Sequence, residues 1–206
     1  MNQILPAYET LWRVVLRCFL EVAFRSTQDQ LNTWQPLLHD FHADPTVKRL
    51  HQKGEHGVSA AMIAKEALRL YPPTRRVYRH FTFSTQVFGL RFQYPPRRLA
   101  ADIEGCQRST TLWGPSADAF EPSRWISIDH TREREILLAF GTPPFLCPAQ
   151  ERFGIMMIAL LVAALLEVVG KDWELSGNGM AEILAGGKPL LTGREDYSKL
   201  IMSRRN

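Results

Sequence analysis

Apolar residues recur at the spacing of one helical face near the start of the chain. Within residues 8–24, five apolar positions share a face, while Arg13, Arg17 and Glu21 fall on another. The five positions are Leu11, Val14, Val15, Cys18 and Val22. Pro6 suits the first turn of such a helix. This stretch predicts an amphipathic helix that turns its apolar face to the core.

Two further helices are predicted before the middle of the chain. Residues 28–41 predict a more polar helix, closed near Asp44-Pro45. Residues 59–70 predict a stronger one, with Ser59 at the N-cap and Ala, Ile and Leu at the apolar positions. Pro72-Pro73 ends this helix, because the residue before a proline avoids the helical conformation.

An uninterrupted apolar run extends over residues 154–166. It holds 13 residues without a charge, whereas a helix that spans a membrane needs about 20. We therefore expect a helix buried on all sides rather than a membrane span. Residues 1–6 offer neither a charged segment nor an apolar stretch, so that no signal peptide is expected.

Looser alternation of polar and apolar residues follows the helix at residues 59–70. Residues 76–93 predict two or three strands, and residues 95–107 predict a turn and a brief strand. Residues 111–125 are rich in turn residues and predict a loop, and residues 127–134 predict an irregular polar segment.

The C-terminal part predicts further short strands, at residues 173–175 and 188–202, with glycine turns between them. The whole pattern is helix-rich with small sheets. We therefore expect an α+β fold, mostly helical with small β-sheets, in a single domain over residues 1–206.

Charge and composition exclude some classes of function. The chain is 45% hydrophobic and 22% charged, as globular proteins are, with a net charge of +4. Its arginines occur in short groups, such as Arg97-Arg98 and Arg204-Arg205. Because no group is long and no recognition motif accompanies it, we do not expect nucleic acid as a partner.

Cysteine and histidine are the candidates for disulfides and metal sites. Cys18, Cys106 and Cys147 are an odd number at wide spacing, which argues against a disulfide framework and for a reducing compartment. His39 and His42 lie three residues apart, so that a metal pair is conceivable. Because no third ligand has suitable spacing, we interpret them as solvated surface histidines.

One cysteine lies on a loop rich in glycine and proline, just before the long apolar run. The loop covers residues 138–149 and contains Cys147. Two interpretations are open. A free cysteine is usually a small buried side chain packed on a helix. Alternatively, a thiolate at a helix N-terminus is stabilised by backbone N–H groups and can act as a nucleophile or a metal ligand.

Glu66 and Arg69 are three residues apart in the helix predicted at residues 59–70, so that they share a face and can pair. An exposed pair would contribute well under about 1 kcal/mol. These two lie among alanine and leucine residues, one turn before Pro72-Pro73. We therefore expect the pair to be partly buried.

Several segments, in this order, resemble the C-terminal part of a cytochrome P450, a haem-thiolate monooxygenase. Glu66-Ala-Leu-Arg69 resembles the Glu-x-x-Arg helix of that family. Residues 113–125, which end in Pro122-Ser-Arg124-Trp125, are similar to its Phe-x-Pro-Glu-Arg-Phe/Trp segment. Residues 140–149 resemble its cysteine loop.

Two segments near the ends of the chain extend the resemblance. Residues 188–197 are similar to the terminal hairpin of fungal members. Residues 6–10 resemble the end of the oxygen-activating helix motif, Ala/Gly-Gly-x-Asp/Glu-Thr. The resemblance implies a chain that runs from the end of the distal helix to the C-terminus of the cytochrome P450 fold.

The resemblance also implies roles around a haem b cofactor. Cys147 would be the axial thiolate ligand of the haem iron, which favours cleavage of the O–O bond. Phe140 would pack beside that thiolate, and Arg79 would face a haem propionate. Glu9 and Thr10 would supply the proton relay to bound dioxygen.

The resemblance implies a structural role for a second set of residues. Glu66, Arg69 and Arg124 would form a buried ion network behind the haem. A buried set of charges is weak evidence for stability, but it is a good candidate for fixing the geometry of its surroundings.

The chain departs from the family pattern at four positions. Pro143 and Ala149 stand where the family usually has glycine, and Ser123 stands in place of the usual glutamate. Phe145 stands where an arginine or histidine usually reaches a propionate. A complete member is more than twice as long, so that the resemblance also implies a truncated chain without the membrane anchor, the first half of the helical domain and most of the distal helix.

We expect a truncated haem-thiolate monooxygenase, which is an oxidoreductase that binds haem iron. We expect it to act on a hydrophobic small molecule in secondary metabolism. A non-redox cyclase or Diels–Alder type catalyst derived from this family is the alternative, and a non-catalytic fragment or partner subunit is a third. The expected partner is a reductase, and the chain is also expected to self-associate. The expected location is cytoplasmic or peripheral at the endoplasmic reticulum.

Overall fold

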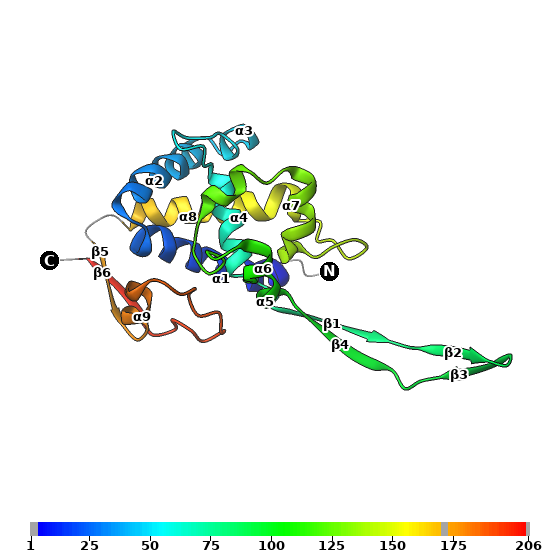
Figure 1. Cartoon of the computed structure of the whole chain (residues 1–206). Coiled ribbons are helices and arrows are strands. Elements are labelled where there is room, and N and C mark those ends of the chain that lie inside the picture. The colour runs from blue at the N-terminus through cyan, green and yellow to red at the C-terminus, as the bar shows by residue number, and fades with distance from the viewer. Residues whose placement is uncertain (1–3, 170–172, 205–206) are drawn as a thin grey trace.

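Four helices form the body of the structure, a computed structural model that describes residues 4–169 and 173–204. They are α1 (Ile4–Leu20), α2 (Gln28–Ala43), α4 (Ala60–Leu70) and α8 (Ile155–Val168). The last of these lies against the other three and crosses the middle of the body (Figure 1). The core is therefore built around α8.

The side chains of α8 explain its central place. Its buried residues are Ile155, Ile158, Ala159, Val162, Ala163 and Leu166, which lie on one face at helical spacing. The other face, which includes Met156, Leu160 and Leu161, is only half-buried. The prediction that this helix is buried on all sides is thus wrong in part, because α1, α2 and α4 cover one side of it.

Local signals set the bounds of the other helices of the body. Thr27 and Gln30 form a reciprocal cap at the start of α2: the Thr27 side chain accepts from the Gln30 N–H (3.3 Å), and the Gln30 side chain accepts from the Thr27 N–H (2.9 Å). A short helix, α3 (Val47–Leu50), follows. Ser59 precedes α4 as predicted, although its side chain makes no capping hydrogen bond.

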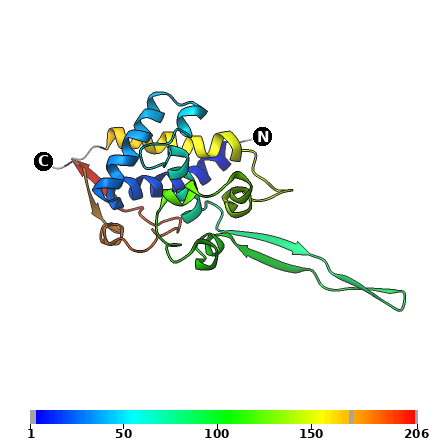
Figure 2. The ribbon, with the colours of Figure 1, turned by 45° about the horizontal axis from the view of Figure 1, so that its top comes forward.

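The strands form three separate antiparallel pairs. β1 (Arg76–Phe81) pairs with β4 (Arg97–Asp102), and β2 (Ser84–Val87) pairs with β3 (Leu90–Gln93). Together these two pairs make one long ribbon that projects away from the helices in both views (Figures 1 and 2). The third pair, β5 (Trp173–Gly177) with β6 (Leu200–Arg204), lies at the far end of the body.

Short helices connect these parts. They are α5 (Ile103–Gln107), α6 (Thr110–Trp113), η2 (Pro122–Ile126), α7 (His130–Ile136), η3 (Leu138–Phe140), η4 (Gln150–Gly154) and α9 (Met180–Ala185). The prediction of an irregular segment at residues 127–134 is wrong, because the Asp129 side chain caps α7 by accepting from the Arg132 N–H (2.8 Å). The strand predicted at residues 188–202 is confined to β6, since only residues 200–204 pair with β5.

None of the helices that the structure describes is both long enough and apolar enough to cross a bilayer.

A buried polar cluster ties the first helix to the C-terminal segment. α1 continues as a π-turn, η1 (Glu21–Arg25), in which Arg25 donates to Glu21 (2.6 Å). The Tyr71 hydroxyl also donates to Glu21, and it accepts from the Leu190 N–H (3.2 Å). Burial raises the pKa of Glu21, and the hydrogen bonds from Tyr71 and Arg25 oppose that rise.

Arg17 belongs to the same region and is also buried. Its guanidinium donates to the backbone carbonyls of Leu191 (2.6 Å), Arg13 (3.1 Å) and Gly193 (3.2 Å). Burial lowers its pKa. The face of the helix that carries Arg17 and Glu21 is therefore polar but buried. Residues 188–193 cover that face and offer carbonyl oxygens to it, so that α1 is buried on more than its apolar side.

Replacement of the buried tyrosine tests this cluster. Tyr71→Phe removes the hydroxyl, so that the buried Leu190 N–H loses its acceptor and Glu21 Oε1 keeps only Arg25 as a donor. We expect the free energy of unfolding to fall by about 1–3 kcal/mol, measured by urea unfolding. Tyr197→Phe is the control, because that hydroxyl also accepts from a backbone N–H, at Leu191 (2.8 Å), but is more exposed. Equal losses in the two variants would contradict a special role for the Tyr71–Glu21 contact.

Candidate functional site

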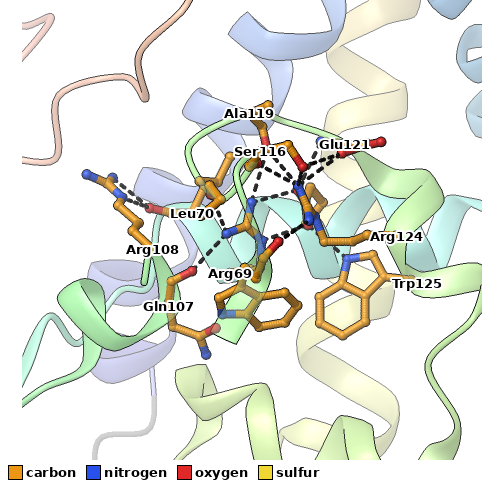
Figure 3. Close-up of polar contacts among 12 residues, drawn as sticks. Arg69, Leu70, Gln107, Arg108, Ser116, Ala119, Glu121, Arg124 and Trp125 are labelled. Carbon is orange, nitrogen blue, oxygen red and sulfur yellow. Dashed lines mark hydrogen bonds and ion pairs between the residues drawn. The ribbon is translucent and has the colours of Figure 1, made fainter. Parts of the chain in front are cut away.

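The Glu66 carboxylate is the centre of a buried polar network. It lies on α4 with no exposed surface. Its Oε1 accepts from Arg69 Nη2 (2.8 Å), from Arg124 Nε (2.9 Å) and from the Glu121 N–H (2.9 Å). Its Oε2 accepts from Arg69 Nε (2.9 Å) and from Trp125 Nε1 (3.0 Å). Arg69, Arg124 and Trp125, which supply four of these five donors, are labelled with their polar contacts in Figure 3.

Arg69 uses every donor of its guanidinium. Besides the two bonds to Glu66, Nη1 donates to the carbonyls of Gln107 (2.8 Å) and Ala117 (2.7 Å), and Nη2 donates to that of Ala119 (3.0 Å). A guanidinium carries five N–H groups, so that none is left unpaired. Arg69 is fully buried. Its charge is therefore surrounded by three backbone carbonyls and one carboxylate.

Arg124, on η2, closes the network from the other side. Its Nη2 donates to the Ser116 carbonyl (2.9 Å) and to Glu121 (3.2 Å). The Trp113 ring lies beside both arginines, with its centroid 4.9 Å from the guanidinium carbon of Arg69 and 5.9 Å from that of Arg124. Both contacts have the geometry of cation–π interactions. Residues 113–125 are thus wrapped around the Glu66–Arg69 pair.

A short chain of contacts leads from this network to the cysteine loop. Gln107, whose carbonyl accepts from Arg69, donates from its side chain to the Ile136 carbonyl (2.9 Å). Ile136 ends α7, and η3 (Leu138–Phe140) follows directly. The Phe140 carbonyl accepts from the Cys147 N–H (2.8 Å). The buried network therefore fixes the point at which the loop begins.

Two glycines allow the loop to fold closely on itself. Gly141 has φ +77°, and a Cβ at this position would lie 2.9 Å from the Phe145 carbonyl oxygen. A Cβ at Gly154, where η4 meets α8, would lie 2.6 Å from the Phe140 ring. The Phe140 ring therefore packs directly on the start of the central helix. This contact holds the loop against α8.

Cys147 and Cys106 are both half-buried, and the residues near Cys147 in the sequence include exposed apolar ones. Phe145, Leu146 and Phe153 surround it in sequence and are 67%, 41% and 51% exposed. By contrast, Cys18 is buried in the core, and burial raises the pKa of its thiol. A cysteine thiolate can ligate a haem iron, and exposed apolar side chains can cover the porphyrin ring. Cys147 and its apolar neighbours in the sequence therefore fit a haem.

Arg79 meets the cysteine loop through Phe145. Its guanidinium carbon lies 4.4 Å from the centroid of the Phe145 ring, which is a cation–π contact. The side chain of Arg79 is otherwise exposed and donates to the neighbouring Tyr78 carbonyl (3.1 Å). The structure therefore brings β1 and the cysteine loop together at this pair.

Glu9 and Thr10 lie on α1, whose first turns are on the same side of the body as the cysteine loop in both views (Figures 1 and 2). The Glu9 carboxylate accepts from Arg13 (3.3 Å) and from Arg194 (3.1 Å). Thr10 is exposed. These two residues are thus near the surface, and the partners of Glu9 are arginines rather than residues of the loop.

The histidines are placed at the surface. His42 Nδ1 lies 2.9 Å from Glu167 Oε1, and His39 Nε2 lies 3.8 Å from the same atom. In the part of the chain that the structure describes, no three side chains of the histidine, cysteine or acidic type come together as a metal site.

Sequence reasoning missed several members of the network. Trp113 and Trp125 lie in a segment whose composition predicts only a loop, and Gln107 lies in one that predicts a turn or strand. The signal that was present is chemical: Trp125 carries an N–H donor directly beside Arg124. The carbonyls of Gln107, Ala117 and Ala119 carry no sequence signal, because every residue has one.

The comparison with protein-family models identifies the class of protein. The model for cytochrome P450 matches residues 60–169, which include the Glu66 network and the cysteine loop. This chain belongs to the cytochrome P450 family.

Curated relatives agree with this assignment, and this chain matches only part of the length of each of them. Cytochrome P450 71A25 of Arabidopsis thaliana is 32% identical over 117 residues, which are 55% of this chain and 23% of that protein. Cytochrome P450 monooxygenase buaD of Petromyces alliaceus is 39% identical over 67 residues, 32% of this chain and 12% of that protein. The chain thus matches about a quarter or less of the length of these relatives.

A solved structure shows the same fold. A six-coordinated cytochrome P450 from Thermus thermophilus is similar with a TM-score of 0.50 and 20% sequence identity, over 75% of this chain and 36% of that one. The α+β architecture, mostly helical with small sheets, is therefore part of a cytochrome P450 fold, as predicted.

Removal of one arginine tests how much the network contributes. Arg69→Ala removes two donors from the buried Glu66 carboxylate and the arginine donor from the Gln107 and Ala117 carbonyls, whereas the Ala119 carbonyl keeps Arg124 (3.4 Å). We expect a loss of about 3–5 kcal/mol in the free energy of unfolding, measured by chemical denaturation. The control is Arg132→Ala, since Arg132 also pairs at a spacing of three, with Glu135 (3.0 Å), but both are exposed. That change should cost no more than about 1 kcal/mol. Similar losses in both variants would contradict the network.

Proposed function

We propose that this chain is the thiolate-bearing part of a cytochrome P450 monooxygenase that acts on a hydrophobic small molecule. The observation that supports this most is the placement of Cys147. Its backbone N–H donates to the Phe140 carbonyl (2.8 Å), its loop carries exposed apolar side chains, and the loop begins where the buried Glu66 network ends. A thiol fixed in this way suits coordination of a metal better than packing in the core.

In this proposal the residues around the loop bind haem b. Cys147 Sγ ligates the iron, and Phe145, Leu146 and Phe153 cover apolar surface of the macrocycle. When bound, the haem supplies the activation of dioxygen and the one-electron chemistry. The Phe140 ring, which packs on Gly154, would lie beside the thiolate. The Glu66 network keeps the loop in place.

Phe145 has a different role from the arginine or histidine that it replaces. It has no group that could pair with a propionate. Its ring instead lies under the Arg79 guanidinium at 4.4 Å, and this contact limits the orientations that the long arginine side chain can take. We assign Arg79 as the partner of a propionate, with Phe145 as the residue that orients it.

Glu9 and Thr10 are proposed as the proton relay. In this relay the Glu9 carboxylate would take up a proton from solvent and pass it to Thr10 Oγ1, which would give its own hydroxyl proton onward. A carboxylate that is about one-third exposed suits the uptake from solvent: the exposed fraction of the Glu9 side chain is 33%. Arg13 and Arg194 hold the carboxylate in place.

The finer features of the function are proposals as well. A hydrophobic substrate, a reductase as redox partner and a place in secondary metabolism accord with the family. The single domain over residues 1–206 and a location in the cytoplasm or at the periphery of the endoplasmic reticulum are further parts of this proposal. Exposed apolar residues on the ribbon support association with another surface, including self-association.

Exchange of single cysteines tests the ligand. We expect the chain loaded with haem, reduced and exposed to carbon monoxide to give the absorption spectrum of a thiolate-ligated haem. Cys147→Ser should abolish that spectrum, whereas Cys18→Ser should leave it, because Cys18 is buried in the core. Equal spectra for the two variants would contradict the assignment of Cys147. Absence of haem binding by the parent chain would instead favour the non-redox or non-catalytic alternative.

Neutral replacement of Arg79 tests the propionate contact. A charge-assisted hydrogen bond contributes about 1.5–3 kcal/mol, so that Arg79→Gln should weaken haem binding at least about tenfold. Titration of the chain with haem, followed by absorbance, measures this. Arg76→Gln is the matched control, because Arg76 lies on the same strand but on its opposite face. A loss for Arg76→Gln as large as that for Arg79→Gln would show a general effect of charge instead of a specific contact.

A further inference from the structure

One buried positive charge, that of Arg17 on α1, has no counter-ion. The residue is only 1% exposed. Among the residues whose side chains the structure describes, no carboxylate pairs with it. Its guanidinium donates instead to the backbone carbonyls of Arg13, Leu191 and Gly193. A charge buried without an opposite charge is costly. An anion beside Arg17 would therefore stabilise this part of the fold.

The acidic side chains of this region are engaged elsewhere. Burial lowers the pKa of Arg17, and the charge of Asp196 opposes this only in part. The Asp196 carboxylate accepts from the Gly193 N–H rather than from the guanidinium. Glu21, one helical turn further along the chain, pairs with Arg25 (2.6 Å). The protein itself thus leaves the charge of Arg17 only partly compensated.

A small cavity lies beside Arg17. It is lined by Arg13 and Arg17 of α1, by residues 71–73 and Arg75 after α4, and by Thr192 of the C-terminal segment. Its volume is about 10 Å³, which is room for about one water-sized group. The cavity is partly open to solvent. One atom of a ligand can therefore enter it while the rest of the ligand stays outside.

The arginines at this cavity offer hydrogen-bond donors that lack acceptors. The Nε atom of Arg13 is buried and has no hydrogen-bond partner among the described residues. Arg17 carries five N–H groups, and three of them are bonded to carbonyls. The other two have no acceptor among the described residues. Because a buried donor without an acceptor destabilises the fold, these groups favour an acceptor in the cavity.

Two carboxylates near the cavity are each shared between two arginines, so that neither is available to Arg17. The pairs are Glu9 with Arg13 (3.3 Å) and Arg194 (3.1 Å), and Glu104 with Arg75 (2.5 Å) and Arg108 (3.1 Å). The excess charge around the cavity is therefore positive even after every one of these pairs is counted. A neutral acceptor would satisfy the donors but leave this excess in place.

We propose that the cavity binds the carboxylate of a small molecule, with one oxygen against the Arg17 guanidinium and Arg13 Nε. The cavity has room for one such oxygen. The N–H groups of Arg13 and Arg17 that lack acceptors supply its hydrogen bonds. A charge-assisted hydrogen bond of this kind is roughly twice as strong as a neutral one. Water is the weaker occupant, because it brings no charge.

The carboxylate belongs either to a free short-chain acid or to the end of a larger apolar molecule. Pro72 and Pro73 supply apolar wall on which a carbon chain can pack. Arg13 follows Thr10 by three residues on α1, which is about 4.5 Å along the helix axis. An apolar acid held here would thus begin within one turn of the proposed proton relay. In that case, which rests on the proposed function, the substrate is a hydrophobic carboxylic acid.

The test is titration calorimetry of the 206-residue chain at constant ionic strength. Sodium acetate and sodium octanoate are the carboxylate probes, and octanamide is the uncharged control. We expect both acids to bind at one site that octanamide does not occupy. Tighter binding of octanoate than of acetate would identify the end of an apolar molecule as the ligand, and equal affinities would identify a free short-chain acid. The titration needs no haem, so that its failure is separate from a failure of the proposed function.

Two variants and a matched control locate the site. Arg13→Gln removes the unpaired Nε and should weaken octanoate binding about tenfold or more. Arg194→Gln is the control, because it also takes an arginine from Glu9 (3.1 Å) but lies outside the lining of the cavity. The control should bind octanoate as the parent chain does. Arg17→Met should abolish binding. If that variant does not fold, Arg13→Gln alone decides the test.

Four results would overturn the proposal. Absence of binding by both acids would mean that water fills the cavity. Equal binding of octanamide and octanoate would assign the binding to exposed apolar surface. Equal losses in Arg13→Gln and Arg194→Gln would show a general effect of charge. Tighter binding of inorganic phosphate than of either acid would contradict the assignment to a carboxylate.

Discussion

The rest of the structure depends on the hydrogen bonds that five N–H groups donate to the buried Glu66 carboxylate. Two come from Arg69, and the others come from Arg124, Trp125 and the Glu121 backbone. A buried carboxylate is costly unless such donors surround it. Since the donors belong to α4 and to residues 121–125, the charge can be buried only when these segments have reached their final places.

The network links stability to the candidate haem site through geometry. Arg69 holds the Gln107 carbonyl, and Gln107 in turn holds the end of α7, directly before the loop that carries Cys147. Phe140 then fixes the loop on the central helix α8. Each step is a single contact of ordinary strength. Together they make the position of the thiol a consequence of the buried charges.

The sequence predicts the elements that follow from periodicity and motif. The helices at α1, α2, α4 and α8 could be placed because their apolar residues recur at helical spacing, and the cysteine loop because glycine and proline mark it. Burial of Arg17 could not be predicted, since the Leu191 and Gly193 carbonyls that cover it lie more than 170 residues away. The helix α7 was missed because its capping Asp129 lies in a segment without apolar periodicity. The Arg79–Phe145 contact needs the fold, because it joins a strand to a loop far along the chain.

The central claim is that Cys147 is held ready as a metal ligand. X-ray absorption at the iron edge of the haem-loaded chain tests it most directly, because sulfur and nitrogen neighbours of iron scatter differently. The account predicts one sulfur in the first coordination shell of the parent chain and none in Cys147→Ser. A shell of nitrogen and oxygen alone in the parent chain, or a sulfur that persists after Cys147→Ser, would contradict it.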